Sequence, residues 1–333
     1  MLHVSVKNPA LLELRQAVRI RFQKLEKLEP YSKVCVGVSG GADSLALAIA
    51  AKLESDNFNI NLIGVIVDHG LQVESAETAA TTRKKLEKIG YTDIFLGKAN
   101  VILTDGLEAS ARRARYKVFE QSMETYGAKT FFLGHTKNDQ AEGVLLGLAR
   151  GSGTKSLSGM QEISGPYIRP FLTIGRSTTE EACREAGIEF WSDPHNIKSE
   201  FSRVRVRENI LPLIEREIGP GIIDALSRSA KILREDATAL DEWADAVFSQ
   251  LNPADIEISA LSDLPIAVRS RVLRRAIHAA GAPIGSISAS HLEPIEAYVS
   301  DWRGQGHTSL PGGVKVGRIS GRLSLSNSQP TQP

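Results

Sequence analysis

The sequence has little that would cross-link the chain or hold a metal cluster. Its 333 residues include only two cysteines, Cys35 and Cys183, which lie far apart. Two such residues cannot build a disulfide framework or a CxxC site for zinc or an iron–sulfur cluster. Cys35 lies inside an apolar run, where a thiol behaves as a small core side chain. This cysteine usage favours a reducing, cytoplasmic setting.

Long apolar runs and a charge of one sign are also missing. No segment approaches the roughly 20 apolar residues that cross a bilayer. Charge is present throughout positions 13–29, where a signal peptide would need an apolar block. The 40 Lys and Arg nearly balance the 39 Asp and Glu, for a net charge of +1. We therefore expect no membrane partner, and a nucleic-acid partner would need a local basic cluster.

The first half of the chain alternates strand and helix patterns. Apolar runs that predict strands cover residues 33–39, 60–70, 92–98 and 129–135. Helical patterns follow each of them, over residues 44–54, 75–90, 107–127 and 138–151, and an amphipathic helix over 11–28 precedes them. Repeated βα units of this length predict an α/β fold, a doubly wound parallel sheet with helices on both faces.

The alternation stops at about Glu208. Helical patterns then run to residue 251 with a break near Pro220, and another covers 265–280. The last ordered pattern, over 312–326, predicts a β-hairpin. We therefore predict a catalytic domain over 1–217, a smaller, mainly helical domain over 218–326 and a flexible tail over 327–333. The glycine-rich segment 151–159 is expected to be a flexible loop.

One strand-to-helix turn carries the clearest signal for ligand binding. The sequence "VGVSGGADSLAL" places two glycines between an apolar strand and an apolar helix. Such a turn exposes backbone N–H groups at the positive end of a helix, which suits phosphate. The alternative is a turn that only packs the helix on the strand. The spacing differs from a Walker A loop and from G-x-G-x-x-G. The expected phosphate-binding residues are Ser39, Gly40, Gly41, Ala42, Asp43 and Ser44.

The spacing S-G-G-x-D-S resembles the pyrophosphate loop (PP-loop) of the ATP-pyrophosphatases, whose fold is adenine nucleotide alpha hydrolase-like. Further stretches occur in the order found in tRNA(Ile)-lysidine synthetases, which the chain resembles from about Lys33 to the C-terminal hairpin. They are "VSGGADS", "VDHGLQ", "LEASARRARY", "GHTKNDQAE", "RGSG", "IRPF", "DPHN" and "FSRVRVRENILP". Each is weak alone, and the ordered set is specific.

The resemblance implies an ATP-dependent carbon–nitrogen ligase that modifies tRNA. Such an enzyme adenylates the wobble cytidine of an isoleucine tRNA with a CAU anticodon and releases pyrophosphate. The ε-amine of L-lysine then displaces AMP to form lysidine. ATP is the co-substrate, and Mg²⁺, which prefers oxygen ligands, is expected on Asp43. The C-terminal region is also a candidate for a homodimer contact.

A pair of carboxylates has the spacing for handling the lysine amine. Asp139 and Glu142 lie three residues apart at a helix start, hence on one face. An amine with a free pKa of about 10.4 needs a carboxylate to bind or take its proton. In the family pattern this pair lies at the lysine site, and Asn138 stands where Asp is frequent. The alternative is that Asp-x-x-Glu forms a helix capping box, and both roles can coexist.

Arginines and histidines supply further candidates. Arg112 and Arg115 share a helix face and match the family's Arg-x-x-Arg-Tyr pattern, in which Arg112 is expected to neutralise phosphate charge during catalysis. Arg113 is expected on a solvated face. His69 and His135 follow strands at the ligand-binding edge. His135 is a candidate nucleotide contact, with packing or capping as the alternative.

The segment "FSRVRVRENILP" concentrates positive charge. Arg203, Arg205 and Arg207 alternate with valines, so a strand would place all three on one face and a helix would pair Arg203 with Arg207. We interpret them as phosphate contacts to tRNA, with a salt bridge between domains as the alternative.

Two other classes of protein remain to be weighed. Another PP-loop enzyme, such as a tRNA thiolase or an NAD or GMP synthetase, would need a persulfide cysteine, an iron–sulfur cluster or an ammonia source. The two isolated cysteines and the lack of a glutaminase pattern argue against these. A non-catalytic ATP-binding module would not need the acid pair, the arginines or a second domain.

Overall fold

The structure is a computed structural model that describes residues 8–28, 32–68, 75–102, 106–151, 153–191 and 202–327. Its contacts divide the chain into two compact units, one up to Leu233 and one from Arg234 onwards. This division falls inside helix α10 (Ile222–Phe248), whereas the sequence predicts a boundary near residue 217. Among the described residues, no helix is long and apolar enough to cross a membrane.

The first unit is built on a six-stranded sheet with the order β3-β2-β1-β4-β6-β5. The strands are β1 (Lys33–Gly37), β2 (Asn61–Asp68), β3 (Asp93–Lys98), β4 (Thr130–Phe132), β5 (Ile163–Ser164) and β6 (Tyr167–Ile168). All neighbours pair in parallel except β5 and β6, which are antiparallel. The predicted doubly wound parallel fold is confirmed. The sequence reading missed β5 and β6, which are too short to show a period.

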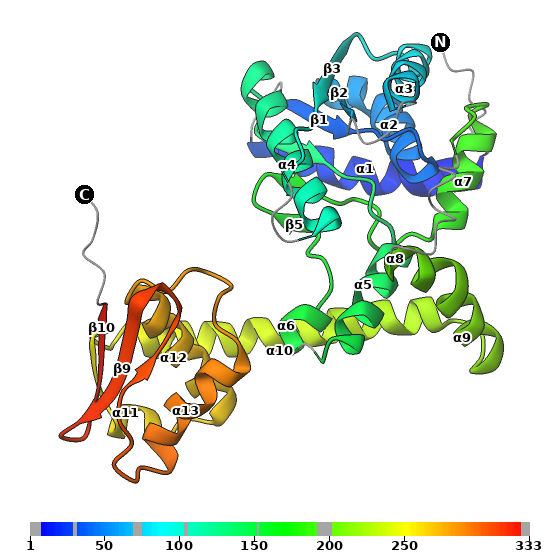
Figure 1. The fold of residues 1–333 in the computed structure, drawn as a ribbon. Helices are drawn as coiled ribbons and strands as arrows, with labels where there is room; N and C mark the ends of the chain where they lie inside the picture. The colour runs from blue at the N-terminus through cyan, green and yellow to red at the C-terminus, as the bar shows by residue number, and fades with distance from the viewer. Residues whose placement is uncertain are drawn as a thin grey trace. The chain divides into compact units, whose positions relative to one another are not determined.

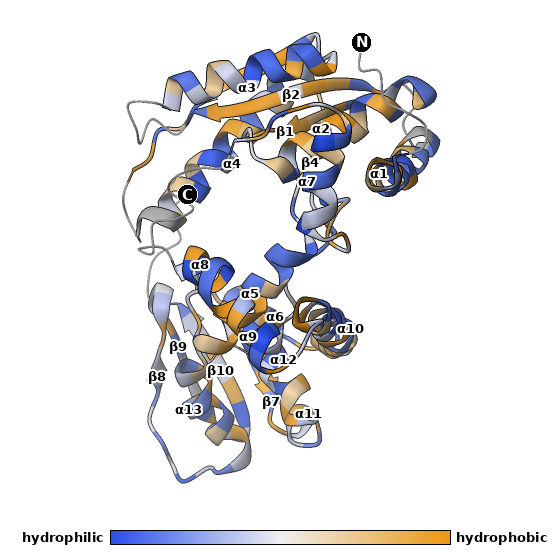
Figure 2. Ribbon diagram, turned by 90° about the vertical axis from the view of Figure 1, so that its right-hand side faces the viewer, coloured by the Kyte–Doolittle hydropathy of each residue, from blue (hydrophilic) through white to orange (hydrophobic). Residues whose placement is uncertain are grey.

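Helices cover both faces of this sheet (Figure 1). They are α1 (Pro9–Leu28), α2 (Ala42–Ser55), α3 (Ser75–Ile89), α4 (Leu107–Tyr126) and α7 (Arg176–Glu185), and a 3₁₀ turn, η1 (Asp56–Phe58), follows α2. Val34 and Val36 of β1 join a core with α1, α2, α3 and α7, while Cys35 joins the core under α4. Alternation along the strand thus assigns each helix to a face. The middle of β1 and of β2 is apolar (Figure 2).

The helices after β4 pack mainly on one another. They are α5 (Lys137–Ala149), α6 (Thr154–Leu157), α8 (Ser202–Arg205), the π-helical turn η3 (Val206–Ile210) and α9 (Leu211–Glu217). Ala141, Val206 and Leu211 form their shared core with the start of α10. The segment 202–212 is therefore helical, not a strand. The prediction of a flexible loop over 151–159 is wrong at α6, where Ser158 N–H bonds back to the Thr154 carbonyl.

The second unit packs helices against a small antiparallel sheet with the order β7-β10-β9-β8. After α10 come β7 (Asp255–Glu257), α11 (Ser259–Ser262), α12 (Ile266–Ala279), α13 (Ala289–Ser300), β8 (Thr308–Ser309), η4 (Pro311–Gly313), β9 (Val314–Ile319) and β10 (Arg322–Asn327). Val272, Ile295 and Val316 are fully buried in its core. The predicted hairpin is β9–β10, and α13 and the outer strands were not predicted.

A buried carboxylate ties α1 to α2. Glu54 is fully buried, and its oxygens accept hydrogen bonds from Arg15 Nε at 2.6 Å and Arg19 Nε at 2.9 Å. Burial alone would raise the pKa of Glu54, but the two arginines outweigh it and lower that pKa. A carboxylate with a lowered folded-state pKa contributes stability above its unfolded pKa and loses it in acid.

We expect Glu54→Gln to lower the free energy of unfolding by about 1–3 kcal/mol near neutral pH, because both arginines lose a buried partner. Chemical unfolding monitored by circular dichroism measures this. Glu87→Gln is the control, since the Glu87 pair with Arg83 is exposed and should change stability by less than about 0.5 kcal/mol. The difference in the free energy of unfolding between wild type and Glu54→Gln should become smaller as the pH falls below about 4, because Glu54 is then protonated. If both substitutions lowered the free energy of unfolding equally, the buried ion pairs of Glu54 would not stabilise the fold as stated.

Candidate active site

The glycine turn lies at the carboxyl end of β1 and leads into α2. Gly40 has a φ of +89°, and a Cβ there would lie 2.6 Å from Thr82 Oγ1, so both conformation and space require glycine. Ser44 braces the turn, since its Oγ accepts from the Ser39 N–H at 3.1 Å and donates to the Gly41 carbonyl at 3.0 Å. The predicted phosphate-binding residues thus form one compact turn at the start of a helix, a geometry suited to an anion.

A second segment lies directly against this turn. A Cβ on Gly134, just after β4, would come within 2.8 Å of the Asp43 carbonyl oxygen and 3.1 Å of Ser44 Cα. Only glycine allows this contact between two backbones. The contact places the segment that begins α5 next to the turn, which brings Asp139 close to Asp43.

The acid pair lies on the first turns of α5. Asp139 Oδ2 accepts from both the N–H (2.8 Å) and the hydroxyl (3.1 Å) of Thr136, so a capping box is present. Its members are Thr136 and Asp139, whereas the sequence pattern alone favours Asp139 and Glu142 as the alternative to a lysine site. Glu142 takes no part in the cap and is fully buried one turn further on. Asp139 therefore caps the helix and still offers Oδ1 to the site.

One arginine that the sequence reading missed joins these groups. Arg176 Nε lies 3.0 Å from Asp43 Oδ2, and its terminal nitrogens lie 3.3 Å from Asp139 Oδ1 and 3.7 Å from Glu142 Oε1. The backbone N–H of Arg176 also donates to Asn138 Oδ1 at 3.0 Å. No motif marks Arg176, because its role depends on three residues far away in the sequence.

Thr179 gives α7 a second link to the turn. Its hydroxyl lies 2.5 Å from Asp43 Oδ1, so both oxygens of Asp43 are engaged by α7. Helix α7 packs against both α1 and α2, which hold it in place. The turn, the acid pair and α7 therefore form one connected polar site.

The three arginines predicted to contact tRNA divide into two groups. Arg207 Nε lies 2.7 Å from Glu142 Oε1, and Arg203 Nε lies 3.3 Å from Glu142 Oε2. Arg207 also reaches Asp139 Oδ1 at 3.4 Å. Arg205 is exposed and donates to Ser202 Oγ at 3.1 Å. The helical spacing thus turns Arg203 and Arg207 toward the acid pair and Arg205 outward.

The carboxylates differ in how readily they bind a proton. Burial raises the pKa of Asp43, partly opposed by Arg176. Burial also raises the pKa of Glu142, with Arg207 opposing it. Burial alone would raise the pKa of Asp139, but Arg176, His135 and the Thr136 N–H lower it below its ordinary value. Asp139 is therefore the firmly ionised member of the pair, and Glu142 is the stronger base.

The remaining predicted residues lie around His135. Burial, with Arg169, Arg203 and Arg112 nearby, lowers the pKa of His135 to about 4, so its imidazole is neutral near pH 7. Its Nδ1 is buried without a hydrogen-bond partner. Arg112 stacks on the Tyr116 ring at 4.9 Å and does not join the acid cluster.

The other predicted residues lie on α4 or just after β2. Arg113 donates to Ser110 Oγ at 3.1 Å. His69 lies outside the described residues.

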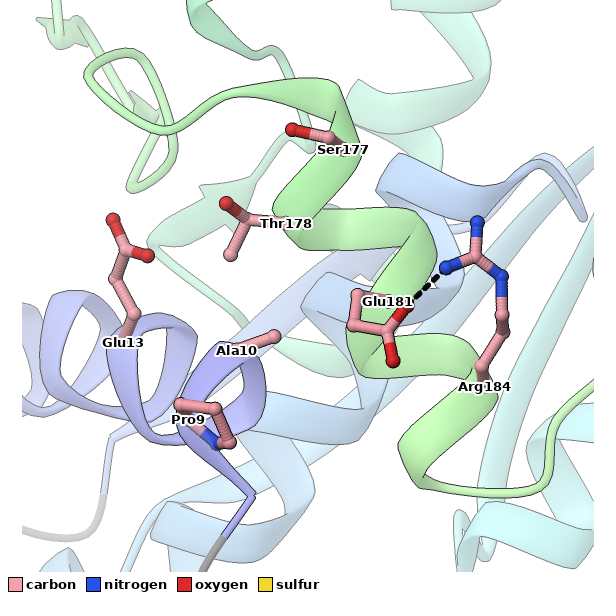
Figure 3. Close-up of a pocket in the computed structure, with 7 residues that line it drawn as sticks. All are labelled: Pro9, Ala10, Glu13, Ser177, Thr178, Glu181 and Arg184. Carbon is pink, nitrogen blue, oxygen red and sulfur yellow. Dashed lines mark hydrogen bonds and ion pairs between the residues drawn. The ribbon is translucent and has the colours of Figure 1, made fainter.

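Two cavities lie near these elements. One of about 190 Å³ adjoins the acid pair and is lined by Asn138, Glu142, Arg207, Leu211, Pro212, Glu215 and Ile223. The other, of about 460 Å³, lies between α1 and α7 (Figure 3). It is lined by Pro9, Ala10, Glu13, Ser177, Thr178, Glu181 and Arg184, none of which is a predicted site residue. Only the smaller cavity touches the site.

The oxygens available here suit Mg²⁺. This ion keeps several waters and binds one or two carboxylates together with substrate phosphates. Asp43 can fill that role, although the described residues contain no group of three or more His, Cys, Asp or Glu that could hold a metal ion. Each Asp43 oxygen accepts one hydrogen bond from α7, and its remaining lone pair is the one that Mg²⁺ would use.

Comparisons with known proteins identify the family of the chain. The family model described as a PP-loop domain matches residues 14–214, and the one described as a TilS substrate binding domain matches residues 257–324. A tRNA(Ile)-lysidine synthase from Thermobifida fusca is 44% identical over 96% of this chain and 98% of its own length. The chain belongs to the tRNA(Ile)-lysidine synthase family. The resemblance read from the motifs is confirmed.

A second relative belongs to the same family, and a solved structure shares the fold. A tRNA(Ile)-lysidine synthase from Streptomyces coelicolor is 43% identical over 88% of this chain and 84% of its own length. Among solved structures, the U34-tRNA thiolase NcsA from Methanococcus maripaludis, with its [4Fe-4S] cluster, matches with a TM-score of 0.58. That match covers 69% of this chain and 81% of the thiolase at 20% identity, so it shows a shared fold only.

We expect Gly134→Ala to weaken ATP binding at least about tenfold, because a methyl group there must push the Asp43 backbone away. Isothermal titration calorimetry with ATP and Mg²⁺ measures this affinity. Gly143→Ala is the matched control, since its Cβ would meet nothing within 4 Å and alanine favours the helix. If Gly134→Ala binds ATP as tightly as the control, the contact does not hold the turn in place.

Proposed function

We propose that this chain adenylates the wobble cytidine of an isoleucine tRNA with a CAU anticodon and then joins L-lysine to carbon 2 of that base. As a member of the tRNA(Ile)-lysidine synthase family it is an ATP-dependent ligase of the PP-loop class. The observation that supports the two steps is the placement of Asp43 and the acid pair around one guanidinium. A nucleotide on the turn and an amine at the acid pair would then be neighbours.

In the first step the turn binds the β and γ phosphates, the leaving group. The cytosine O2 attacks the α-phosphorus, the bond from that phosphorus to the bridging oxygen breaks, and pyrophosphate departs. Backbone N–H groups at Gly40 and Gly41, together with the start of α2, stabilise the developing charge. Bound Mg²⁺ would add charge neutralisation to the same phosphates, and Asp43 is the residue that would hold it.

In the second step the acid pair handles the lysine amine. Asp139, with its lowered pKa, holds the incoming ammonium as a fixed negative charge. Glu142, with its raised pKa, takes the proton, because a base whose pKa is closer to neutral transfers protons more effectively. The free amine then attacks carbon 2 of the base, and AMP leaves with the oxygen.

The smaller cavity is the proposed place for the lysine side chain. Leu211 and Ile223 provide apolar walls for its methylene groups, while Glu142 lies at the acid-pair end of the cavity. Glu215 is held by the N–H groups of Gly221 and Ile223, so its carboxylate is fixed at this rim.

Recognition of the tRNA is proposed for two regions. Arg205, exposed on α8, is the member of the arginine cluster placed to reach phosphate, while Arg203 and Arg207 act through Glu142. The second unit contains the match to the TilS substrate binding domain. The homodimer and the cytoplasmic location belong to this proposal, and light scattering tests the former.

Asp43→Asn should abolish pyrophosphate release, because the turn loses the carboxylate proposed for Mg²⁺. A coupled pyrophosphate assay with tRNA, ATP and lysine measures this, and circular dichroism checks the fold. Glu13→Gln, in the larger cavity between α1 and α7, is the control and should release pyrophosphate at the wild-type rate. Undiminished release by Asp43→Asn would rule out the role given to Asp43.

Glu142→Gln should separate the two steps. We expect pyrophosphate release to persist while transfer of lysine falls at least about a hundredfold, since the proton acceptor is lost. Mass analysis of the tRNA should then show the adenylated intermediate in place of lysidine. Lysidine formation at the wild-type rate would exclude Glu142 as the base.

A further inference from the structure

The polar site balances its own charge. Three carboxylates (Asp43, Asp139 and Glu142) lie within ion-pair distance of three guanidinium groups, those of Arg176, Arg203 and Arg207. The formal charges cancel. Without nucleotide, an additional ammonium group would therefore enter a site where every carboxylate already has a cation, and its desolvation would be poorly compensated.

Arg176 differs from the other two arginines in its reach. It contacts all three carboxylates, whereas Arg207 contacts the two members of the acid pair and Arg203 contacts Glu142. It is also the arginine that faces the turn where phosphate is proposed to bind. Its side chain is only 19% exposed, so it cannot exchange these partners for water at low cost.

Binding of a nucleotide with Mg²⁺ would change this balance. The metal would compete for Asp43, and the triphosphate would offer the Arg176 guanidinium new oxygens with a stronger negative charge. Asp139 and Glu142 would then lose one of their counter-cations. That loss removes one of the three cations beside the acid pair and exposes the oxygens that Arg176 had occupied, so an ammonium group meets less repulsion at the point where it has to bind.

We propose that Arg176 is a positioning residue that makes lysine binding conditional on nucleotide binding. In the nucleotide-free protein its guanidinium occupies the position beside the acid pair that the substrate ammonium would take. When nucleotide binds, the phosphate oxygens become the partners of this guanidinium and the position is vacated. This inference rests on the proposed function. It adds an order of binding, nucleotide before amine, which prevents lysine from occupying the site without an activated partner.

The test is equilibrium binding, which needs no turnover. The affinity of wild type for L-lysine is measured by calorimetry with and without Mg²⁺ and α,β-methylene-ATP, an analogue that cannot release pyrophosphate. We expect the analogue to tighten lysine binding about tenfold or more, and lysine to tighten the analogue by the same factor. Equal lysine affinity in both conditions would overturn the inference.

Arg176→Gln gives a result that a merely structural role would not produce. Removing the internal cation should tighten lysine binding to the nucleotide-free protein and abolish the dependence on nucleotide. A structural role would instead weaken lysine binding. Arg176→Lys should restore part of the wild-type behaviour, because it keeps the charge but not the planar fork. Coupling of wild-type size in Arg176→Gln would overturn the inference.

Arg184→Gln is the matched control on the same helix. Arg184 pairs with Glu181 of the same helix, as Figure 3 shows, and is 56% exposed. It should keep the wild-type coupling. If wild type binds neither lysine nor the analogue in any condition, the proposed function fails as well. If it binds both without coupling, only the present inference fails.

Discussion

The site depends on the ion-pair cluster in which Arg176 lies between Asp43 and the acid pair. Buried carboxylates are costly unless cations and hydrogen bonds compensate them, and here three arginines from α7, α8 and η3 do so. The same cluster joins the turn after β1 to the helix after β4. Segments separated by about a hundred residues thus meet in one polar site, above the apolar core that packs α2 and α7 together.

Much of the fold could be predicted from the sequence. Buried parallel strands such as β1 and β2 are continuous apolar runs, and the glycine turn between β1 and α2 has a recognisable chemistry. The two-residue strands β5 and β6 could not be predicted, since a strand needs several residues to show its alternation. Helix α6 was missed because glycines on both sides of it indicate a loop.

The site was predictable only where a residue belongs to a motif. Asp43, Asp139 and Glu142 were found because their neighbours in the sequence set the pattern. Arg176 was not, because its partners come from other elements and no local spacing records them. For the same reason, the contacts of Arg203 and Arg207 could not be predicted. Alternation with valine indicated a shared face, but the sequence could not say that this face meets Glu142.

The close approach of Gly134 to Asp43 has a consequence for engineering. The two backbones are already in van der Waals contact, so no side chain can be added at Gly134 without moving the turn that contains Asp43. The distance between these two segments is therefore fixed on the proposed nucleotide side of the site. The walls at Leu211 and Ile223 belong to α9 and α10, which that contact does not include. An effort to accept a shorter or longer amine in the proposed lysine site should therefore substitute the residues of those walls, which leaves the proposed nucleotide site unchanged.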